Sequence, residues 1–193
     1  VIADGTLNVN GKANGIKSEN EKKAGRGYVL VTGGDLTVTG GSSNAINAKT
    51  EIVLAGGKLK IADSKEGVEA AHVLLASGKG EIKTSDDGIN ATGVRPWFAM
   101  TGGDWQVDTG GDGFDSNGAA YVGGGKMVID GPADARAASL DAESGLEIDG
   151  GTLFAAGPAG MDETPSSGSS QTAIKVDTSV KAQATVTIVD SNG

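Results

Sequence analysis

The stretch TGGDWQVDTGGDGFDSNG (101–118) contains the two features that decide the fold. A Gly-Gly pair precedes a short segment in which Trp and Val alternate with polar residues, and this alternation is typical of a strand with one buried side. A further glycine then precedes Phe114, with Asp112 and Asp115 on either side of that pair. The stretch therefore joins a glycine turn, a strand, and a glycine–apolar pair framed by acids.

The same order of features returns along the chain every 21 to 26 residues. The second glycine of the turn stands at Gly34, Gly57, Gly78, Gly103, Gly125 and Gly151. Each repeat holds three short strand-like segments, which is too little chain for a hairpin sheet and suits one coil of a solenoid. We therefore predict an all-β fold, a right-handed parallel β-helix of about eight coils stacked about 4.8 Å apart.

The composition agrees with one thin solenoid domain over residues 1–193. Only 37% of the residues are hydrophobic and 4% are aromatic, so small aliphatic side chains must form the core. The net charge of −9 disfavours nucleic acid and anionic membranes as partners and allows cations or neutral polymers. There is no cysteine, and no apolar run is long enough to insert into a membrane.

Variation in the repeat length predicts surface loops at 18–27, 92–97, 131–139 and 162–172. The final segment, 181–193, has the alternation of a strand, and we expect it to close the end of the rod. Because the chain starts with VIADGTLNV, already in strand pattern, we expect a fragment or processed form that lacks N-terminal sequence.

The acids recur because stacking places equivalent residues of successive coils in rows. Aligned on the glycine–apolar pair, the residue before it is Asn14, Asn44, Glu66, Asp87 and Asp112, and the residue after it is Lys17, Asn47, Glu69, Asn90 and Asp115. Two carboxylates about 4.8 Å apart repel by about 3.5 kcal/mol at an effective dielectric constant of about 20. Raised pKa values or a bound cation would offset that repulsion.

Oxygen ligands from Asp, Glu and Asn are those that calcium prefers. The candidate metal ligands are Glu66, Glu69, Asp86, Asp87, Asn90, Asp112, Asp115 and Asn117. The alternative is that these acids form an ordinary solvated face.

A second row predicts contacts to sugars. Tyr28, His72 and Trp97 align one residue before an apolar triplet, on the side of the strand that Glu51 marks as outward. We name these three aromatic residues and Arg95 as candidate carbohydrate-binding residues, because exposed aromatic rings stack on sugar rings. The alternative is that the aromatic residues pack under a loop. Trp105 is assigned to the core instead, because it aligns with leucines of other repeats.

Catalysis is the weaker hypothesis. His72 is the only histidine, so a histidine-based catalytic triad would have to use it and would need a second candidate group nearby. Stacked carboxylates meet the spacing of a glycoside hydrolase without special arrangement. A polysaccharide lyase would need a base, for which Lys65, Lys83 and Arg95 are available.

Four stretches resemble a bacterial extracellular family of carbohydrate-binding domain-containing proteins. They are KEGVEA, SDDGINA, the opening stretch TGGDWQVDTGGDGFDSNG, and GGTLFAAGPAGMDETPSSGSSQ, and the likeness extends over roughly residues 10–176. The resemblance implies a polysaccharide-lyase-like right-handed parallel β-helix with bound calcium at the acidic positions named above. It also implies a secreted or cell-surface location and binding to cellulose-like or acidic, pectin-type polysaccharides of plant cell walls. The first coils depart from the pattern, since Asn14, Lys17, Asn44 and Asn47 replace the acids.

Three functions follow for comparison. The preferred one is a non-catalytic, calcium-dependent or calcium-stabilised carbohydrate-binding protein with a polysaccharide as its partner. The second is a polysaccharide lyase or glycoside hydrolase on the same fold. The third is a structural adhesin or stalk in which calcium only stiffens the rod.

Overall fold

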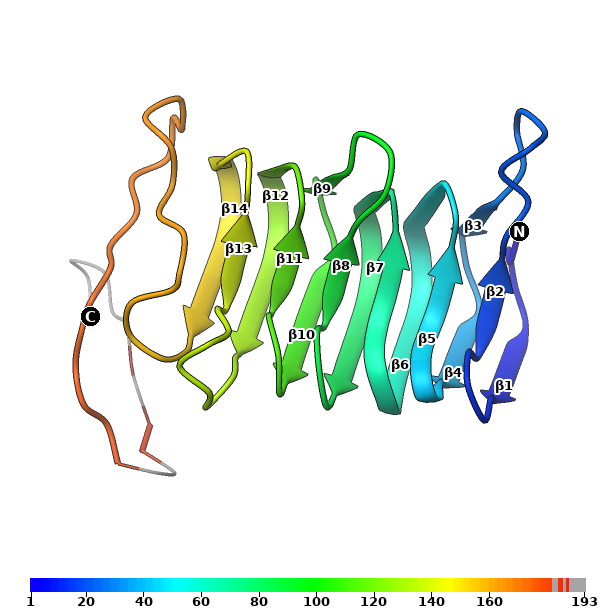
Figure 1. The fold of residues 1–193 in the computed structure, drawn as a ribbon, viewed down its shortest axis with the longest axis horizontal. Helices are drawn as coiled ribbons and strands as arrows, with labels where there is room; N and C mark the ends of the chain where they lie inside the picture. The colour runs from blue at the N-terminus through cyan, green and yellow to red at the C-terminus, as the bar shows by residue number, and fades with distance from the viewer. Residues whose placement is uncertain (182–183, 186, 188–193) are drawn as a thin grey trace.

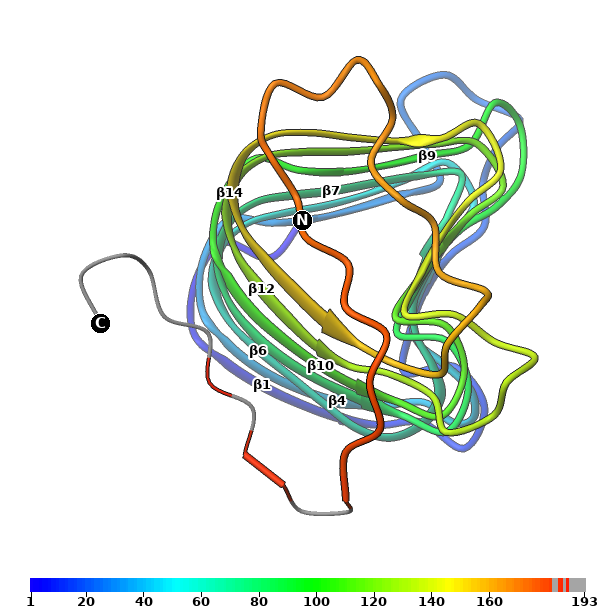
Figure 2. The same ribbon diagram turned by 90° about the vertical axis from the view of Figure 1, so that its left-hand side faces the viewer.

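The computed structural model describes residues 1–181, 184–185 and 187 and is a β-solenoid of about six turns. Figure 1 shows the strands side by side along the long axis, with β1 (Thr6–Asn10) at one end and β14 (Leu146–Ala156) towards the other. Viewed along that axis in Figure 2, the coils superpose into one cross-section. The predicted all-β parallel β-helix is confirmed, with about six coils instead of about eight, because regular strands end at Ala156.

The strands fall into three faces, and the pairings between successive coils are parallel. The first face contains β1, β4 (Asp35–Thr39), β10 (Asp104–Thr109), the middle of β6 (Glu51–Ala70), and the later parts of β7 (His72–Thr84), β12 (Ala119–Asp130) and β14. The second face contains β2 (Ile16–Ser18), β5 (Gly41–Ala48), β8 (Ile89–Ala91), β11 (Phe114–Ser116), β13 (Leu140–Ala142) and the end of β6. The third face contains β3 (Tyr28–Val31), β9 (Trp97–Met100) and the beginnings of β6, β7, β12 and β14.

The corner between the third and first faces is made by the repeated glycine turn. All six second glycines of the repeat have a positive φ, between 77° and 99°, a conformation that residues with a side chain adopt only at a cost. The corners also stack closely: a Cβ built on Gly57 would lie 2.5 Å from the carbonyl oxygen of Gly34 on the preceding coil. The periodic glycine is therefore required by both the turn and the stacking.

The core is a narrow stack of aliphatic and aromatic side chains. Val29, Ile52 and Phe98, which the sequence places inward on the third face, are at most 6% exposed. Trp105 is 1% exposed, as expected for a core residue. Its indole occupies the space above Gly80, its register partner on the preceding coil, where a Cβ would come within 2.3 Å of the ring. The large side chain of Trp105 thus fits because its register partner on the preceding coil, Gly80, has no side chain.

The predicted loops at 18–27, 92–97 and 131–139 lie mainly in the connections between strands. The segment 162–172 is also without regular strand, but it is tied to the last coil. The backbone amides of Glu163, Ser166 and Gln171 donate to the carbonyl oxygens of Leu140, Leu146 and Ile148 at 2.7 to 3.0 Å. It therefore crosses the end of the core, where we expected residues 181–193 to do so. Most of that predicted strand lies outside the described residues.

In the described part of the chain no helix has the length and apolarity needed to cross a membrane.

The stacking of the glycine corners can be tested against the turn conformation alone. We expect Gly57→Ala to lower the free energy of unfolding by about 3 kcal/mol, because the added methyl group meets both a strained φ and the backbone of the preceding coil. Gly5→Ala is the matched control: its φ is 91°, but a Cβ there would meet nothing within 4 Å, so a loss of about 1 kcal/mol is expected. Urea unfolding of both variants measures the difference, and equal losses would contradict a role for close stacking.

Candidate functional site

The acidic residues lie on the outer surface of the second face in the rows that the sequence predicts. The register pairs Asn44 with Glu66 and Asn47 with Glu69, and it continues from Glu69 to Asn90 and then to Asp115. The row goes on to Asp141, which pairs with Asp115 and was missed by the sequence reading. Its signal was present in SLDA (139–142), an apolar residue and an acid as in GFDS, but without the preceding glycine.

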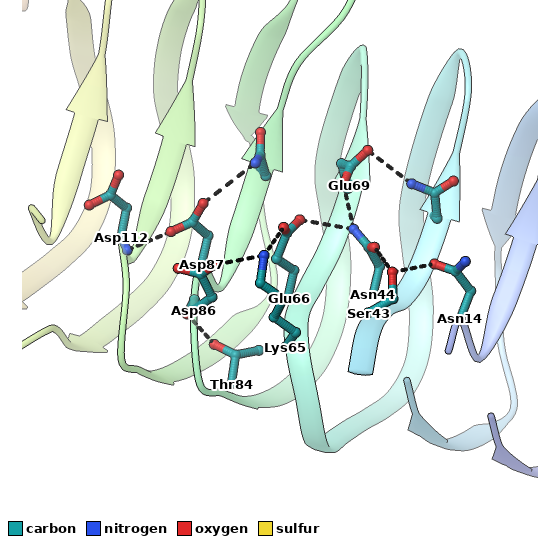
Figure 3. A network of polar contacts seen from close by, with 12 residues as sticks. Asn14, Ser43, Asn44, Lys65, Glu66, Glu69, Thr84, Asp86, Asp87 and Asp112 are labelled. Carbon is teal, nitrogen blue, oxygen red and sulfur yellow. Dashed lines mark hydrogen bonds and ion pairs between the residues drawn. The ribbon is translucent and has the colours of Figure 1, made fainter. Parts of the chain in front are cut away.

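Side chains of neighbouring residues already satisfy the acids nearest the N-terminus. The side-chain amide of Asn44 donates to both Glu66, at 2.9 Å, and Glu69 (Figure 3). Asn47 donates to the other oxygen of Glu69 at 3.0 Å. Burial, and then the hydrogen bond and charge of Glu69, raise the pKa of Glu66 to about 7. Asn44 and Asn47, two of the residues that replace acids in the first coils, therefore act as hydrogen-bond donors to the first acidic coil.

Two other predicted ligands also have partners of their own. The carboxylate of Asp86 pairs with the Lys65 ammonium at 3.0 Å, and Lys65 also lies 3.5 Å from Glu66. The side-chain amide of Asn117 donates to the hydroxyl of Thr92 at 3.3 Å. Among the eight predicted ligands, these contacts separate Asp86 and Asn117 from the acids that remain unpaired.

Asp87, Asp112 and Asp115 form a compact cluster, called here the aspartate triad. One carboxylate oxygen from each of the three lies within 4.8 Å of the others. Asp87 accepts the backbone amide of Asp112 at 2.8 Å, and Asp112 accepts the backbone amide of Ala138 at 2.6 Å. Each bond reaches from one coil to the next and fixes the carboxylate, and the second oxygen of Asp87 accepts from the side-chain amide of Asn90 at 3.5 Å. Among the described residues, no ion pair involves the triad.

The pKa values of all three carboxyl groups of the triad are raised. Burial, and then the charges of Asp87, Asp141 and Asp112, raise the pKa of Asp115 to about 7. Burial likewise raises the pKa of Asp87 to about 6, although the amide of Asp112 acts against it. The pKa of Asp112 is also raised, mainly by burial. Protons or a cation would relieve this repulsion.

The donor set fits a hard divalent cation such as calcium. The triad supplies carboxylate oxygens. The side-chain amide nitrogen of Asn90 donates to Asp87, and the side-chain oxygen Oδ1 of Asn90 is buried without a hydrogen-bond partner among the described residues. Calcium takes six to eight oxygen ligands, often including carboxylates and amide carbonyls. Of the eight predicted ligands, the structure brings Asp87, Asn90, Asp112 and Asp115 close together.

The predicted aromatic row lies on the outer surface of the third face. The register runs from Tyr28 to Glu51, then to His72 and Trp97. The rings of His72 and Trp97 are stacked, with centroids 4.9 Å apart and planes 13° from parallel. Tyr28 is 38% exposed and stands apart from that pair, with Glu51 between them. The structure therefore brings together two of the three aromatic residues.

The backbone of Arg95, in the loop before β9, contacts the aromatic pair. The carbonyl oxygen of Arg95 lies 3.2 Å from Nε2 of His72. Arg95 has a φ of 52°, an unusual value for a residue with a side chain. The contact connects the 92–97 loop with the stacked rings.

Two of the three candidate bases of a lyase, Lys65 and Lys83, pair with acids. The hydrogen bond and charge of Asp86 raise the pKa of Lys65, and those of Asp108 raise the pKa of Lys83. A lysine that serves as a general base at neutral pH needs a lowered pKa. The surroundings of these two lysines therefore favour their charged form over a catalytic role.

A shallow groove of about 440 Å³ lies on the first face, away from both the triad and the aromatic pair. Its charged residues pair with each other, as Lys60 does with Glu81 at 3.7 Å and Lys58 with Asp35 at 3.9 Å. These exposed pairs alternate in sign and show the features of a solvated charged surface.

The sequence model of one protein family, the carbohydrate-binding domain-containing proteins, matches residues 1–113. This range is more than half of the 193 residues. The chain belongs to the carbohydrate-binding domain-containing protein family. No curated protein and no solved structure matches the chain.

Membership of the carbohydrate-binding domain-containing family indicates that a carbohydrate is the partner. The matched range includes the stacked pair of His72 and Trp97, and it ends one residue after Asp112. Two surfaces of this family member thus deserve comparison as carbohydrate sites, the aspartate triad on the second face and the aromatic pair on the third.

The raised pKa values predict a pH dependence of stability when no divalent cation is bound. Because the folded state holds its protons more tightly at Asp115, Asp87 and Glu66, the free energy of unfolding is expected to fall as the pH rises from about 4 to about 7. We expect Asp115→Asn to flatten that slope and to raise the free energy of unfolding at pH 8 by about 1 kcal/mol, a value reduced for solvent screening.

Urea unfolding in EDTA between pH 5 and pH 8, at pH steps of about half a unit, measures this slope. Asp130→Asn is the control, since Asp130 is an exposed acid on the first face, and it should leave the slope unchanged. A stability that is flat or that rises over this range in the unsubstituted protein would contradict the expectation.

Proposed function

We propose that this protein is a calcium-stabilised β-solenoid that binds polysaccharides, with acidic, pectin-type glycans held at the aspartate triad. The observation that carries the proposal is the triad itself, three carboxylates within 4.8 Å of one another, two of them fixed by backbone amides, and without an ion-pair partner in the described part of the chain. In a family that binds carbohydrate, such a cluster offers a means of recognising acidic sugars.

The net charge of −9 gives a bound cation a definite role in holding an acidic polysaccharide. An acidic polysaccharide and a surface bearing Asp87, Asp112, Asp115 and Asp141 repel each other. A bound calcium ion would neutralise the carboxylates and present a coordination position to a sugar carboxylate or hydroxyl. The chain itself supplies the rigid frame, because the backbone amides of Asp112 and Ala138 hold two of the three carboxylates in place.

The third face supports binding of cellulose-like glycans as part of the same function. Tyr28, His72, Arg95 and Trp97 are proposed to contact sugar there, and the stacked rings of His72 and Trp97 favour this role. The resemblance to extracellular bacterial proteins extends the proposal to a secreted or cell-surface location, where such polysaccharides are met.

Calcium and glycan binding can be tested together. We expect saturating calcium to raise the melting temperature by about 5 °C or more, because a ligand bound only by the folded state stabilises it. Polygalacturonate should bind in calcium and not in EDTA, as measured by calorimetry. Asp115→Asn should reduce both effects strongly, and Asp130→Asn should leave both intact.

The same experiment separates the rival functions. Calcium-dependent melting without affinity for polygalacturonate would favour the structural stalk. Accumulation of unsaturated sugar, followed by its ultraviolet absorbance, would favour the lyase. Binding of polygalacturonate that survives both EDTA and Asp115→Asn would overturn the metal-bridged proposal.

A further inference from the structure

The aromatic row on the third face ends in an abrupt change of side-chain size. It runs from His72 to Trp97 and then to Ala119, which is exposed and contributes one methyl group. On the next coil the corresponding place is Gly145, directly before Leu146, the register partner of Ala120. A Cβ built on Gly145 would meet nothing within 4 Å. The indole of Trp97 therefore stands next to two coils that carry almost no side chain.

The two faces of the Trp97 ring differ. One is covered by His72, whose ring is stacked on it at 4.9 Å. Among the described residues no other ring stacks on Trp97, which is half-buried, and its register partner on the next coil is the small residue Ala119. His72 thus fixes the indole from one side, which lowers the entropy lost when a ligand stacks on the other.

Tyr121 limits this shelf along the strand. It is two residues after Ala119 on β12 and therefore projects from the same side of the sheet, where it is 36% exposed. Its ring leans over Gly123, because a Cβ there would come within 2.6 Å of the ring. The contact with Gly123 holds the ring on the side away from Ala119.

The charges around the shelf select an uncharged ligand. Trp97, Ala119 and Tyr121 carry no charge, and the register partner of Tyr121 on the next coil is the exposed acid Glu147. A carboxylate at this position accepts hydrogen bonds from sugar hydroxyls and repels a uronate.

We propose that Trp97, Ala119, Gly145 and Tyr121 form a stacking subsite for an uncharged, β-1,4-linked glycan chain. In such a chain the ring substituents are equatorial, so each pyranose presents C–H bonds to the electron-rich face of an indole. One sugar ring stacks on Trp97, and Ala119 and Gly145 leave room for it because they carry a methyl group and no side chain, respectively. The inference rests on the proposed binding of cellulose-like glycans at the third face and deepens it, because it names the residues that make the subsite and requires no cation.

The decisive variant is Ala119→Leu, whose larger side chain fills the space next to Trp97 without contacting the core. Ala119 is exposed at the start of a strand, so the change should leave the melting temperature unchanged. Ala156→Leu, an equivalent change at an exposed alanine at the end of β14, is the control. Cellohexaose and xylohexaose are titrated in EDTA and followed by calorimetry and tryptophan fluorescence, and the fluorescence change reports Trp97 because Trp105 is 1% exposed.

We expect both hexaoses to bind the unsubstituted protein and to change its tryptophan emission. Ala119→Leu should weaken the affinity about tenfold or more and Trp97→Ala should do the same, as expected for the loss of a stacking contact. Ala156→Leu should bind normally. Calcium-dependent binding of polygalacturonate should persist in Ala119→Leu, which keeps this inference separable from the metal-bridged proposal.

Three results would overturn the subsite. They are an Ala119→Leu variant that binds the hexaoses as well as the unsubstituted protein, binding without a change in emission, and no binding of either hexaose in EDTA. Sedimentation adds a fourth: self-association of the unsubstituted protein that Ala119→Leu abolishes would assign this surface to a second copy of the chain.

Discussion

The parallel pairing of one coil with the next is the constraint on which the rest of the structure depends. It places residues of equal position about 4.8 Å apart, so every choice at one position is made again beside itself on the next coil. Glycine must therefore recur at the corner that carries Gly34 and Gly57, because neither the turn nor the neighbouring backbone leaves room for a side chain. The same rule turns isolated acids in the sequence into the rows of the second face.

Much of this arrangement can be read from the sequence because its signals are local and periodic. The glycine turn, the alternation of the strands and the glycine–apolar pair each recur within one repeat, and they predict the faces, the rows and the direction of residues such as Val29 and Trp97. The number of coils was less well predicted. Strand ends depend on whether a neighbouring coil exists to pair with, and residues 162–172 cross the end of the stack without forming a regular strand.

The division of the acidic rows could not be predicted in the same way. Alignment shows that Asn44, Glu66 and Asp87 share a position, but not that Asn44 reaches Glu69 or that Lys65 turns towards Asp86. Those contacts depend on side-chain rotamers and decide which carboxylates remain unpaired. Asp141 was missed because the repeat loses its glycine there, although the backbone pairing continues. The compensation between Trp105 and Gly80 was missed because it concerns two coils at once.

The bonds from carboxylates to the amides of the next coil have a mechanical meaning. Asp87 reaches Asp112, and Asp112 reaches Ala138, so charge-assisted bonds cross two successive boundaries of a stack in which each coil touches only its neighbours. Tension along the rod is borne by every boundary in series, and the weakest one sets the force at which the rod opens. A ligand bound by the triad would add contacts across these same boundaries, so a pull on that ligand would act on the part of the rod that the ligand itself strengthens.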